Sequence, residues 1–231
     1  MSAPVADRVL VFAGGDRCRP EDLDGLPADA LVVAADSGAE HAVALGWSVD
    51  VLVGDLDSIG PELAARLEAA GTRVLRHPEA KDQTDLALAL DTAAGLGARS
   101  ITVVGGHGGR LDHLLANVAL LAADEYAGVA VDARLGPARV TIVRNGRRPL
   151  TGRHGDLVTL LATGGAALGV STGGLLFPLT DAELRPGSSR GVSNELLDPA
   201  RAWVEVAEGT VTVIQPGVRG ALADRAQLDR P

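Results

Sequence analysis

Short apolar runs alternate with stretches of helical periodicity over the first half of the chain. These runs do not alternate strictly between apolar and polar residues, which is typical of strands buried on both faces of a parallel sheet. The pattern predicts an α/β fold, with a mostly parallel open sheet and flanking helices. The predicted strands are residues 9–15, 30–38, 49–55, 72–78 and 100–106.

Helices are predicted between these runs. Residues 61–71 open with Pro61 and close with Gly71, the usual residue types at a helix start and just beyond a helix end. A second helix is expected to follow the polar segment at residues 81–85.

A third helix is predicted within residues 110–125, where apolar residues recur with the helical period. We expect this apolar stripe to pack on the core and to leave Asp112, His113 and Asn117 off the core side. The stripe consists of Leu111, Leu114, Leu115, Val118, Leu121 and Ala122.

After about residue 128 the sequence predicts no long helix. Seven short apolar runs with turn residues between them favour a β-sandwich. The charge-free residues 157–180 are long enough to span a bilayer, but their Gly-Gly pairs and Pro178 favour short strands broken by turns. We therefore expect an α/β domain at residues 1–130 and an all-β sandwich domain at residues 131–231. The runs are residues 129–135, 139–146, 156–163, 169–174, 190–195, 202–209 and 210–217.

The charge balance excludes some classes of partner. The chain has 21 basic and 30 acidic residues, a formal net charge of −9, and no basic run, which argues against a nucleic acid or an anionic membrane. Cys18 is the single cysteine, so an intrachain disulfide is excluded and a reducing compartment is indicated. Because the first residues also lack the pattern of an export signal, we expect a cytoplasmic protein.

Acidic residues follow several of the predicted strands. Asp36 follows the second strand, and Asp55 and Asp57 follow the third. Ligands of open parallel sheets bind beyond the carboxyl ends of the strands, so these side chains are expected at one edge of the sheet. Asp85 and Asp112 are expected to complete an acidic rim there.

The Asp55 and Asp57 pair predicts a cation. In a strand the two side chains point to the same side about 7 Å apart, and two such charges at 4 Å near a protein surface repel by on the order of 4 kcal/mol. Mg²⁺ suits this site because it binds one or two carboxylates together with water and substrate phosphates. The alternative is that Asp55 and Ser58 shape a turn and cap the helix that starts at Pro61.

Two further features favour phosphate binding. The GGHGG segment at residues 105–109 offers backbone N–H groups just before a helix N-terminus. Lys81 is the only lysine beside 20 arginines, and a compact ammonium group serves as a point charge on a phosphate. Either feature also has a plain alternative, which is a tight turn for the glycines and chance retention for the lysine.

The motifs together resemble one known family. The segments AADSGAEHAVALG, VDVLVGDLDSI, KDQTDLALAL, GGRLDHLLANVALL, GLLFPL and GVSNE occur in this order between residues 30 and 195. In combination they resemble the thiamine pyrophosphokinase (thiamine diphosphokinase) family. The resemblance implies a nucleotide-binding α/β domain and a β-sandwich that binds thiamine and forms a homodimer. It also implies that thiamine lies between the α/β domain of one subunit and the sandwich of the other.

The resemblance further implies transfer of a diphosphate group from ATP to the hydroxyl group of thiamine, giving thiamine diphosphate and AMP. Positioning, Mg²⁺ and nearby cations are expected to carry most of the catalysis, and an aspartate near the hydroxyl, either Asp85 or Asp112, to take its proton. The implied catalytic residues are Asp55, Asp57, Asp85 and Asp112, of which the first three hold the metal. The implied ATP-binding residues are Asp36, Lys81, Thr84, Arg110, His113 and Asn117, and the implied thiamine-binding residues are Phe177, Ser193 and Asn194.

Two segments depart from the family pattern. Residues 37–40 read Ser-Gly-Ala-Glu where the family often has Gly-Gly-Ala-Asn after the first aspartate, and Leu176 stands where a lysine is usual. Phe177 still offers an aromatic face for thiamine, although an ordinary sandwich hairpin is the alternative at this place.

Two other functions fit parts of the sequence. VLVGDLDS also resembles the nucleophile motif of haloacid-dehalogenase-type phosphatases, in which Asp55 attacks the phosphate and Asp57 is the acid. That assignment leaves GGRLDH without a role and puts the motif after the third strand rather than the first. The other alternative is a sensor that binds nucleotide or thiamine without turnover.

Overall fold

The apolar runs of the first half form one parallel sheet. The computed structural model describes residues 6–80, 82–218 and 220, and the chain divides into two units, residues 1–136 and 137–231. In the first unit the strand order is β6-β5-β1-β2-β3-β4, with every neighbouring pair parallel. The strands are β1 (Arg8–Ala13), β2 (Leu31–Ala35), β3 (Val51–Gly54), β4 (Arg73–Arg76), β5 (Ser100–Gly105) and β6 (Ala130–Leu135).

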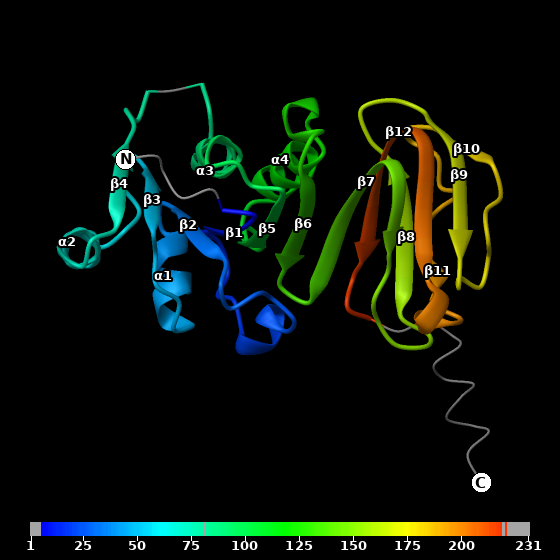
Figure 1. Cartoon of the computed structure of the whole chain (residues 1–231), viewed down its shortest axis with the longest axis horizontal. Helices are drawn as coiled ribbons and strands as arrows, with labels where there is room; N and C mark the ends of the chain where they lie inside the picture. The colour runs from blue at the N-terminus through cyan, green and yellow to red at the C-terminus, as the bar shows by residue number, and fades with distance from the viewer. Residues whose placement is uncertain (1–5, 81, 219, 221–231) are drawn as a thin grey trace, which may run out of the picture. The chain divides into compact units, whose positions relative to one another are not determined.

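Helices cover this sheet on both faces (Figure 1). Helices α3 and α4 lie on one side of the strands, and α1 lies on the other. As predicted, α2 starts at Pro61, and Gly71 follows its end with a φ of +99°. The helices are α1 (Gly38–Ala44), α2 (Pro61–Ala69), α3 (Asp85–Gly95) and α4 (Leu111–Leu121), and short 3₁₀ helices lie at Pro20–Leu23 and Asp124–Tyr126.

The core of the first unit explains the unbroken apolar runs. In β1, five consecutive residues from Val9 to Ala13 are buried, so both faces of the strand are covered. Phe12 is fully buried, and its ring lies 6.2 Å from that of Trp47. Full burial of one large apolar side chain contributes about 1.5–3 kcal/mol. The predicted doubly covered sheet is confirmed.

The predicted core stripe of α4 is wrong in its first turns. Leu121 is buried, but Leu111 and Leu115 are 68% and 62% exposed. Both leucines lie one helical turn apart, so they form one exposed apolar strip rather than part of the core. Periodicity indicates that a helix has an apolar face, but it does not indicate what covers that face.

The boundary between the two units lies later in the chain than the sequence predicted. The division lies between Gly136 and Pro137, not after residue 130. Strand β6 pairs in parallel with β5, so this run extends the first sheet instead of opening the β-rich unit. Along β6, buried residues alternate with half-buried ones.

The second unit is antiparallel and β-rich. Strand β12 pairs with β7, β8 and β9, while β10 pairs with β9 and β11 pairs with β8. Strand β7 pairs with both halves of β12, with a register shift between Val206 and Thr210, whereas β9 pairs with the first half and β8 with the second. The strands are β7 (Ala138–Pro149), β8 (Leu157–Ala162), β9 (Ala167–Gly173), β10 (Ala182–Leu184), β11 (Asn194–Glu195) and β12 (Trp203–Gln215).

One hydrophobic cluster joins these strands. Val143, Leu160, Val170, Leu184 and Val213 come from five different strands and are all buried in it. Strands that share one core between their inner faces make a sandwich, as the sequence predicted. Residues 157–180 belong to β8, β9 and their connections, and no helix in the described ranges is long and apolar enough to cross a membrane.

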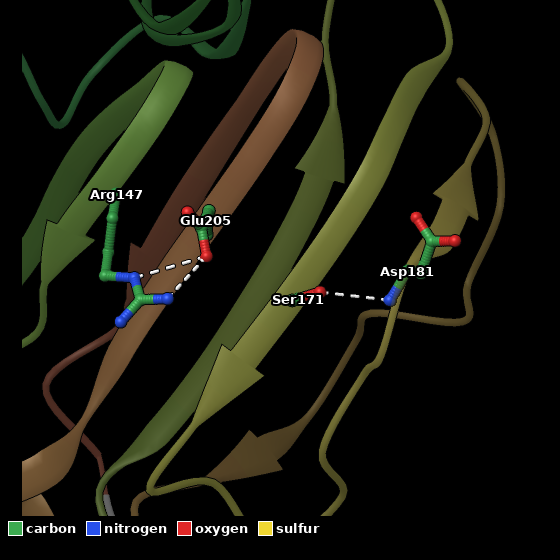
Figure 2. Close-up of polar contacts among 4 residues, drawn as sticks. All are labelled: Arg147, Ser171, Asp181 and Glu205. Atoms are coloured by element: carbon green, nitrogen blue, oxygen red, sulfur yellow. Dashed lines mark hydrogen bonds and ion pairs between the residues drawn. The ribbon is translucent and has the colours of Figure 1, made fainter.

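Polar contacts cross the outer surface of this unit (Figure 2). Arg147 on β7 donates from Nη2 to Glu205 on β12 at 2.6 Å, and its guanidinium lies 3.8 Å from the centre of the Trp203 ring. The backbone N–H of Asp181, just before β10, donates to the Ser171 hydroxyl on β9 at 3.0 Å. These contacts help to fix the register between neighbouring strands, which the apolar core alone does not do.

Candidate active site

The candidate active site lies where the strand order of the first sheet reverses. From β1 the chain moves through β2, β3 and β4 on one side, then returns to place β5 on the other side of β1. At this switch point the loops after β1 and β5 touch: Asp16 N–H donates to His107 O at 2.8 Å, and Gly106 N–H to Gly14 O at 2.7 Å. Such a crevice is the usual ligand site of an open α/β sheet.

A cavity of about 460 Å³ opens at this crevice. Its wall combines glycine backbone with polar and charged side chains from the loops after β1, β2, β4 and β5 and from the start of α4. The residues include Gly14, Gly15, Asp36, Ser37, Glu79, Gln83, Thr84, Asp85, Gly106, His107, Gly108, Gly109, Arg110, His113 and Asn117. Asp36, Thr84, Asp85, Arg110, His113 and Asn117, which the sequence suggested, therefore share one cavity.

Three carboxylates lie close together beside this cavity. Asp36, Asp55 and Asp57 each offer an oxygen, and these oxygens lie within 4.8 Å of one another. Asp36 is only 6% exposed, and its Oδ1 has no hydrogen-bond partner among the described residues. Burial raises the pKa of Asp36, and hydrogen bonds from Ser37 and Ser58 oppose that shift. The geometry thus joins Asp36 to the acidic pair.

The turn after β3 holds the acidic pair in place. Asp57 N–H donates to Asp55 Oδ1 at 3.3 Å, and the Ser58 hydroxyl donates to Asp57 Oδ1 at 2.8 Å. The turn in the alternative interpretation is therefore present. The cap is not, because the residue before α2 is Gly60, whose N–H bonds to Glu40 Oε1 at 3.3 Å. Ser58 serves the acidic pair instead.

Asp85 lies against the same turn. Gly54 has a φ of +149°, and a Cβ at this position would lie 3.0 Å from Asp85 Oδ1 and 3.2 Å from Asp36 Cβ. Gly54 therefore lets the two acids approach the backbone closely. Thr84 fixes the start of α3, because its hydroxyl oxygen accepts a hydrogen bond from Ala87 N–H at 3.2 Å. The cap explains how Asp85 is held at this edge.

Asp112 lies in a different environment from the other acids. Its two oxygens accept hydrogen bonds from Arg110 Nε at 3.1 Å and Nη2 at 2.5 Å. This pairing lowers the pKa of Asp112 to about 2. Arg110 and His113 line the cavity, whereas Asp112 is not among its lining residues. Asp112 is therefore paired with Arg110, and its part in the acidic rim stays a prediction.

Asn117 supports the glycine loop. Its Nδ2 donates to Gly106 O at 2.9 Å, and Gly106 has a φ of +74°. The amide thus holds the loop in a left-handed turn that places backbone N–H groups beside the cavity. Lys81, suggested for the phosphates, lies outside the described residues.

The three residues suggested for thiamine lie together in the second unit. Asn194 is buried and clamps Phe177, accepting from Phe177 N–H at 3.0 Å and donating to Phe177 O at 2.7 Å. The Phe177 side chain is left 63% exposed. Ser193 is exposed with a φ of +60°, and its N–H donates to Thr159 Oγ1 at 3.1 Å. Asn194 therefore orients the loop that presents Phe177 and Ser193.

Three cavity residues were not singled out by the sequence. Gln83 lies inside the KDQTD segment, and its position between two suggested residues was a usable signal. His107 lies in GGHGG, which indicated backbone groups only, yet its buried Nδ1 lacks a hydrogen-bond partner in the described part of the chain. Glu79 carried no signal, because it lies in an irregular loop after β4.

Family models match both units of the chain. The model of the thiamin pyrophosphokinase catalytic domain matches residues 26–131, and that of the thiamin pyrophosphokinase vitamin B1 binding domain matches residues 143–211. The first match contains the acidic turn, α3 and the glycine loop. The second contains Phe177, Ser193 and Asn194.

Known proteins agree with this match over nearly the whole chain. Thiamine pyrophosphokinase of Bacillus subtilis (strain 168) is 28% identical over 216 residues, which cover 90% of this chain and 97% of that protein. The crystal structure of a Bacillus subtilis thiamine pyrophosphokinase covers 90% of this chain and 98% of its own, with a TM-score of 0.77 and 26% identity. That of the Geobacillus thermodenitrificans enzyme covers 90% and 96%, with a TM-score of 0.73 and 27% identity. With both of its domains matched in their order, the chain belongs to the thiamin pyrophosphokinase family.

Proposed function

We propose that this protein transfers a diphosphate group from ATP to the hydroxyl group of thiamine, giving thiamine diphosphate and AMP. The observation that carries the proposal is the cavity at the switch point, where carboxylates and glycine backbone meet within a chain of this family. Both domains match the family, which favours this reaction over a phosphatase or a binding protein without turnover.

Mg²⁺ is proposed as the cofactor, and the residues present fit it. Hard carboxylate oxygens are the ligands that Mg²⁺ prefers, and the buried Asp36 Oδ1 without a hydrogen-bond partner among the described residues is a site for a cation. Asp55 and Asp57, with Asp36 and Asp85 beside them, would hold the ion. When bound, it would neutralise the phosphate charge.

The protein's own groups would position the substrates. Gly108 and Gly109 line the cavity in the loop that Asn117 holds at Gly106, and their backbone N–H groups would bind phosphate oxygens. Arg110 and His113 line the same cavity and supply positive or hydrogen-bonding groups. Asp85 is our choice for the base that accepts the thiamine hydroxyl proton, because a carboxylate whose pKa is about 2, as in Asp112, is a weak base.

The reaction is tested by incubating the protein with ATP, Mg²⁺ and thiamine and separating the products by chromatography. AMP and thiamine diphosphate should form in equal amounts, only with thiamine present, and should vanish with EDTA. Inorganic phosphate released from a monoester without ATP would identify the phosphatase instead, and saturable binding without product would identify the sensor.

Asp57→Asn tests the acidic pair. Removing one charge from the metal-binding carboxylates should lower kcat at least about a hundredfold, while circular dichroism stays unchanged because Asp57 is exposed. Glu68→Gln, which removes an exposed acid paired with Arg76, is the matched control and should keep full activity. A near-normal rate in Asp57→Asn would remove this residue from the mechanism.

We also propose that the protein is a homodimer in which thiamine binds at a site completed by the second copy. Leu111 and Leu115 form an exposed apolar strip on α4 in the first unit, and Phe177 is exposed in the second. Exposed apolar residues of this kind are often covered by a protein partner, which supports the proposed dimer. A cytoplasmic location is proposed on the single cysteine, Cys18, which is free.

The oligomeric state is measured by size-exclusion chromatography with light scattering. The expected mass is twice that of the 23.5 kDa chain. The double variant Leu111→Gln/Leu115→Gln should shift the protein toward monomer, whereas Ala65→Gln on the exposed side of α2 should not. A wild-type monomer at all concentrations would contradict the proposal.

A further inference from the structure

A second cavity lies next to the first one in the same unit. It has a volume of about 400 Å³ and shares Gln83, Thr84, Ala116 and Asn117 with the proposed ATP cleft. On its other side it is lined by Asp91 from α3 and by Tyr126. Gln83 therefore forms part of the wall between the two cavities, and no role was predicted for it.

A chain of hydrogen bonds connects these residues. The Tyr126 hydroxyl donates to Asp91 Oδ1 at 2.8 Å, and Gln83 Nε2 donates to Asp91 Oδ2 at 2.8 Å. Tyr126 is only 3% exposed, and burial, followed by the bond to Asp91, raises its pKa. Its hydroxyl therefore stays protonated at neutral pH and remains a donor to the carboxylate. Tyr126 thus holds the Asp91 carboxylate in place, and Asp91 in turn holds the Gln83 amide.

The chemistry of a carboxylate fixes which way the Gln83 amide is turned. An ionised aspartate accepts hydrogen bonds and donates none, so only the NH₂ end of the amide can face Asp91. The carbonyl oxygen of Gln83 then has to face away from Asp91. The Gln83 side chain is exposed, and Gln83 also lines the first cavity, to which neither Asp91 nor Tyr126 contributes.

We propose that Asp91, held by Tyr126, is a positioning residue that presents the Gln83 carbonyl oxygen to the exocyclic amino group of a bound substrate. The inference rests on the proposed function, because both of its substrates carry such a group, ATP on adenine and thiamine on its pyrimidine ring. An acceptor at Gln83 selects the amino form of either ring over the oxo form, which has an acceptor at the same position.

Asp91→Asn reverses this selection. An asparagine that still accepts from Tyr126 presents its NH₂ group to Gln83, and the Gln83 amide must turn to accept it. Its own NH₂ group then faces the cleft and suits an oxo group. The change keeps the size of residue 91 and removes one charge, so Glu68→Gln is the control for charge loss alone.

The experiment compares kcat/KM for two pairs of substrates. ITP carries an oxygen where ATP carries the amino group, and oxythiamine does so relative to thiamine. In Asp91→Asn the amino-to-oxo preference should fall about tenfold or more for one pair and stay unchanged for the other, which identifies the substrate that Gln83 contacts. The change should reside in KM rather than kcat. Unchanged preference for both pairs overturns the proposal.

Two further measurements separate this inference from the proposed function. Tyr126→Phe keeps the carboxylate but removes its support, so the same preference should fall by a smaller factor. The side-chain NH₂ signals of Gln83 in the ¹⁵N NMR spectrum should shift in Asp91→Asn and Tyr126→Phe but not in Glu68→Gln, whether or not the enzyme turns over. Unmoved Gln83 signals would show that Asp91 does not orient the amide.

Discussion

Asp55 and Asp112 are acids of the same motif set, but their surroundings give them different chemistry. Asp55 lies among other carboxylates, where a cation is needed to balance the charge. Asp112 has its counter-charge already, because Arg110 donates two hydrogen bonds to it. Both were predicted to belong to one acidic rim, because spacing along a chain does not reveal which arginine pairs with which acid.

Arg110→Gln should raise the pKa of Asp112 from about 2 toward the ordinary value near 4. Removal of the paired guanidinium withdraws both hydrogen bonds that stabilise the charged form. Carbon-13 NMR titration of the Asp112 carboxyl group measures the shift directly. The control is Arg185→Gln, which breaks a similar exposed pair with Glu183 and should leave Asp112 unchanged.

The sign of the effect on stability follows from the direction of this shift. The pKa of Asp112 is lower in the folded chain than in an unfolded one, so the pair stabilises the fold at pH values above about 4. This contribution is lost as the pH falls toward 2. An Asp112 pKa that stays near 2 in Arg110→Gln would mean that another group stabilises the carboxylate.

The site residues that the sequence could identify are those fixed by strand ends. Asp36, Asp55 and Asp85 follow strands or start helices, and the parallel sheet brings such positions together. Tyr126 and Asp91 are 35 residues apart and meet through packing of α3 against the segment after α4. No local pattern encodes that contact, so the network behind Gln83 became visible only in the structure.

At the scale of elements, α1 depends on close contact with β1. A Cβ on Gly38 would collide with the backbone oxygen of Phe12, and the backbone cannot yield as a flexible side chain does. Gly95, at the end of α3, has nothing within 4 Å of the same position. Two glycines in helices therefore have opposite tolerance for a methyl group.

Gly38→Ala should destabilise the first unit by roughly 1–3 kcal/mol because the helix must shift away from the strand. Gly95→Ala should stabilise it by about 0.5–1 kcal/mol, since alanine loses less backbone entropy on folding. Urea unfolding followed by Trp47 fluorescence in a Trp203→Phe background measures the first unit alone. Equal stability of the two variants would contradict the close packing of α1 on β1.

Helix α4 shows how far a hydrophobic pattern can be interpreted. Its position was predicted, because the helical period of residues 110–125 contains the observed helix, Leu111–Leu121, although the predicted stretch runs beyond its end. Its burial was not, because the apolar strip that starts at Leu111 faces away from the core of its own unit. Periodicity indicates that a helix has an apolar face, but it does not show which surface, if any, covers that face.

At the scale of the molecule, the division into an α/β unit and a β-rich unit was predictable because the period of the apolar pattern changes along the chain. The position of the boundary was not. Strand β6 has the same alternating composition as the strands of the second unit, and only its parallel pairing with β5 assigns it to the first. Pairing partners are non-local, so composition alone cannot rank them.

Strand β12 has a consequence for the order of events during synthesis. It pairs with β7, β8 and β9 and contributes Val204, Val206, Val211 and Val213 to the core of the second unit. A growing chain that ends before Trp203 lacks the strand shared by all three neighbours, whereas β1 to β6 are already complete at Leu135. The half of the chain that matches the vitamin B1 binding domain is therefore expected to fold last, after the catalytic half has left the ribosome.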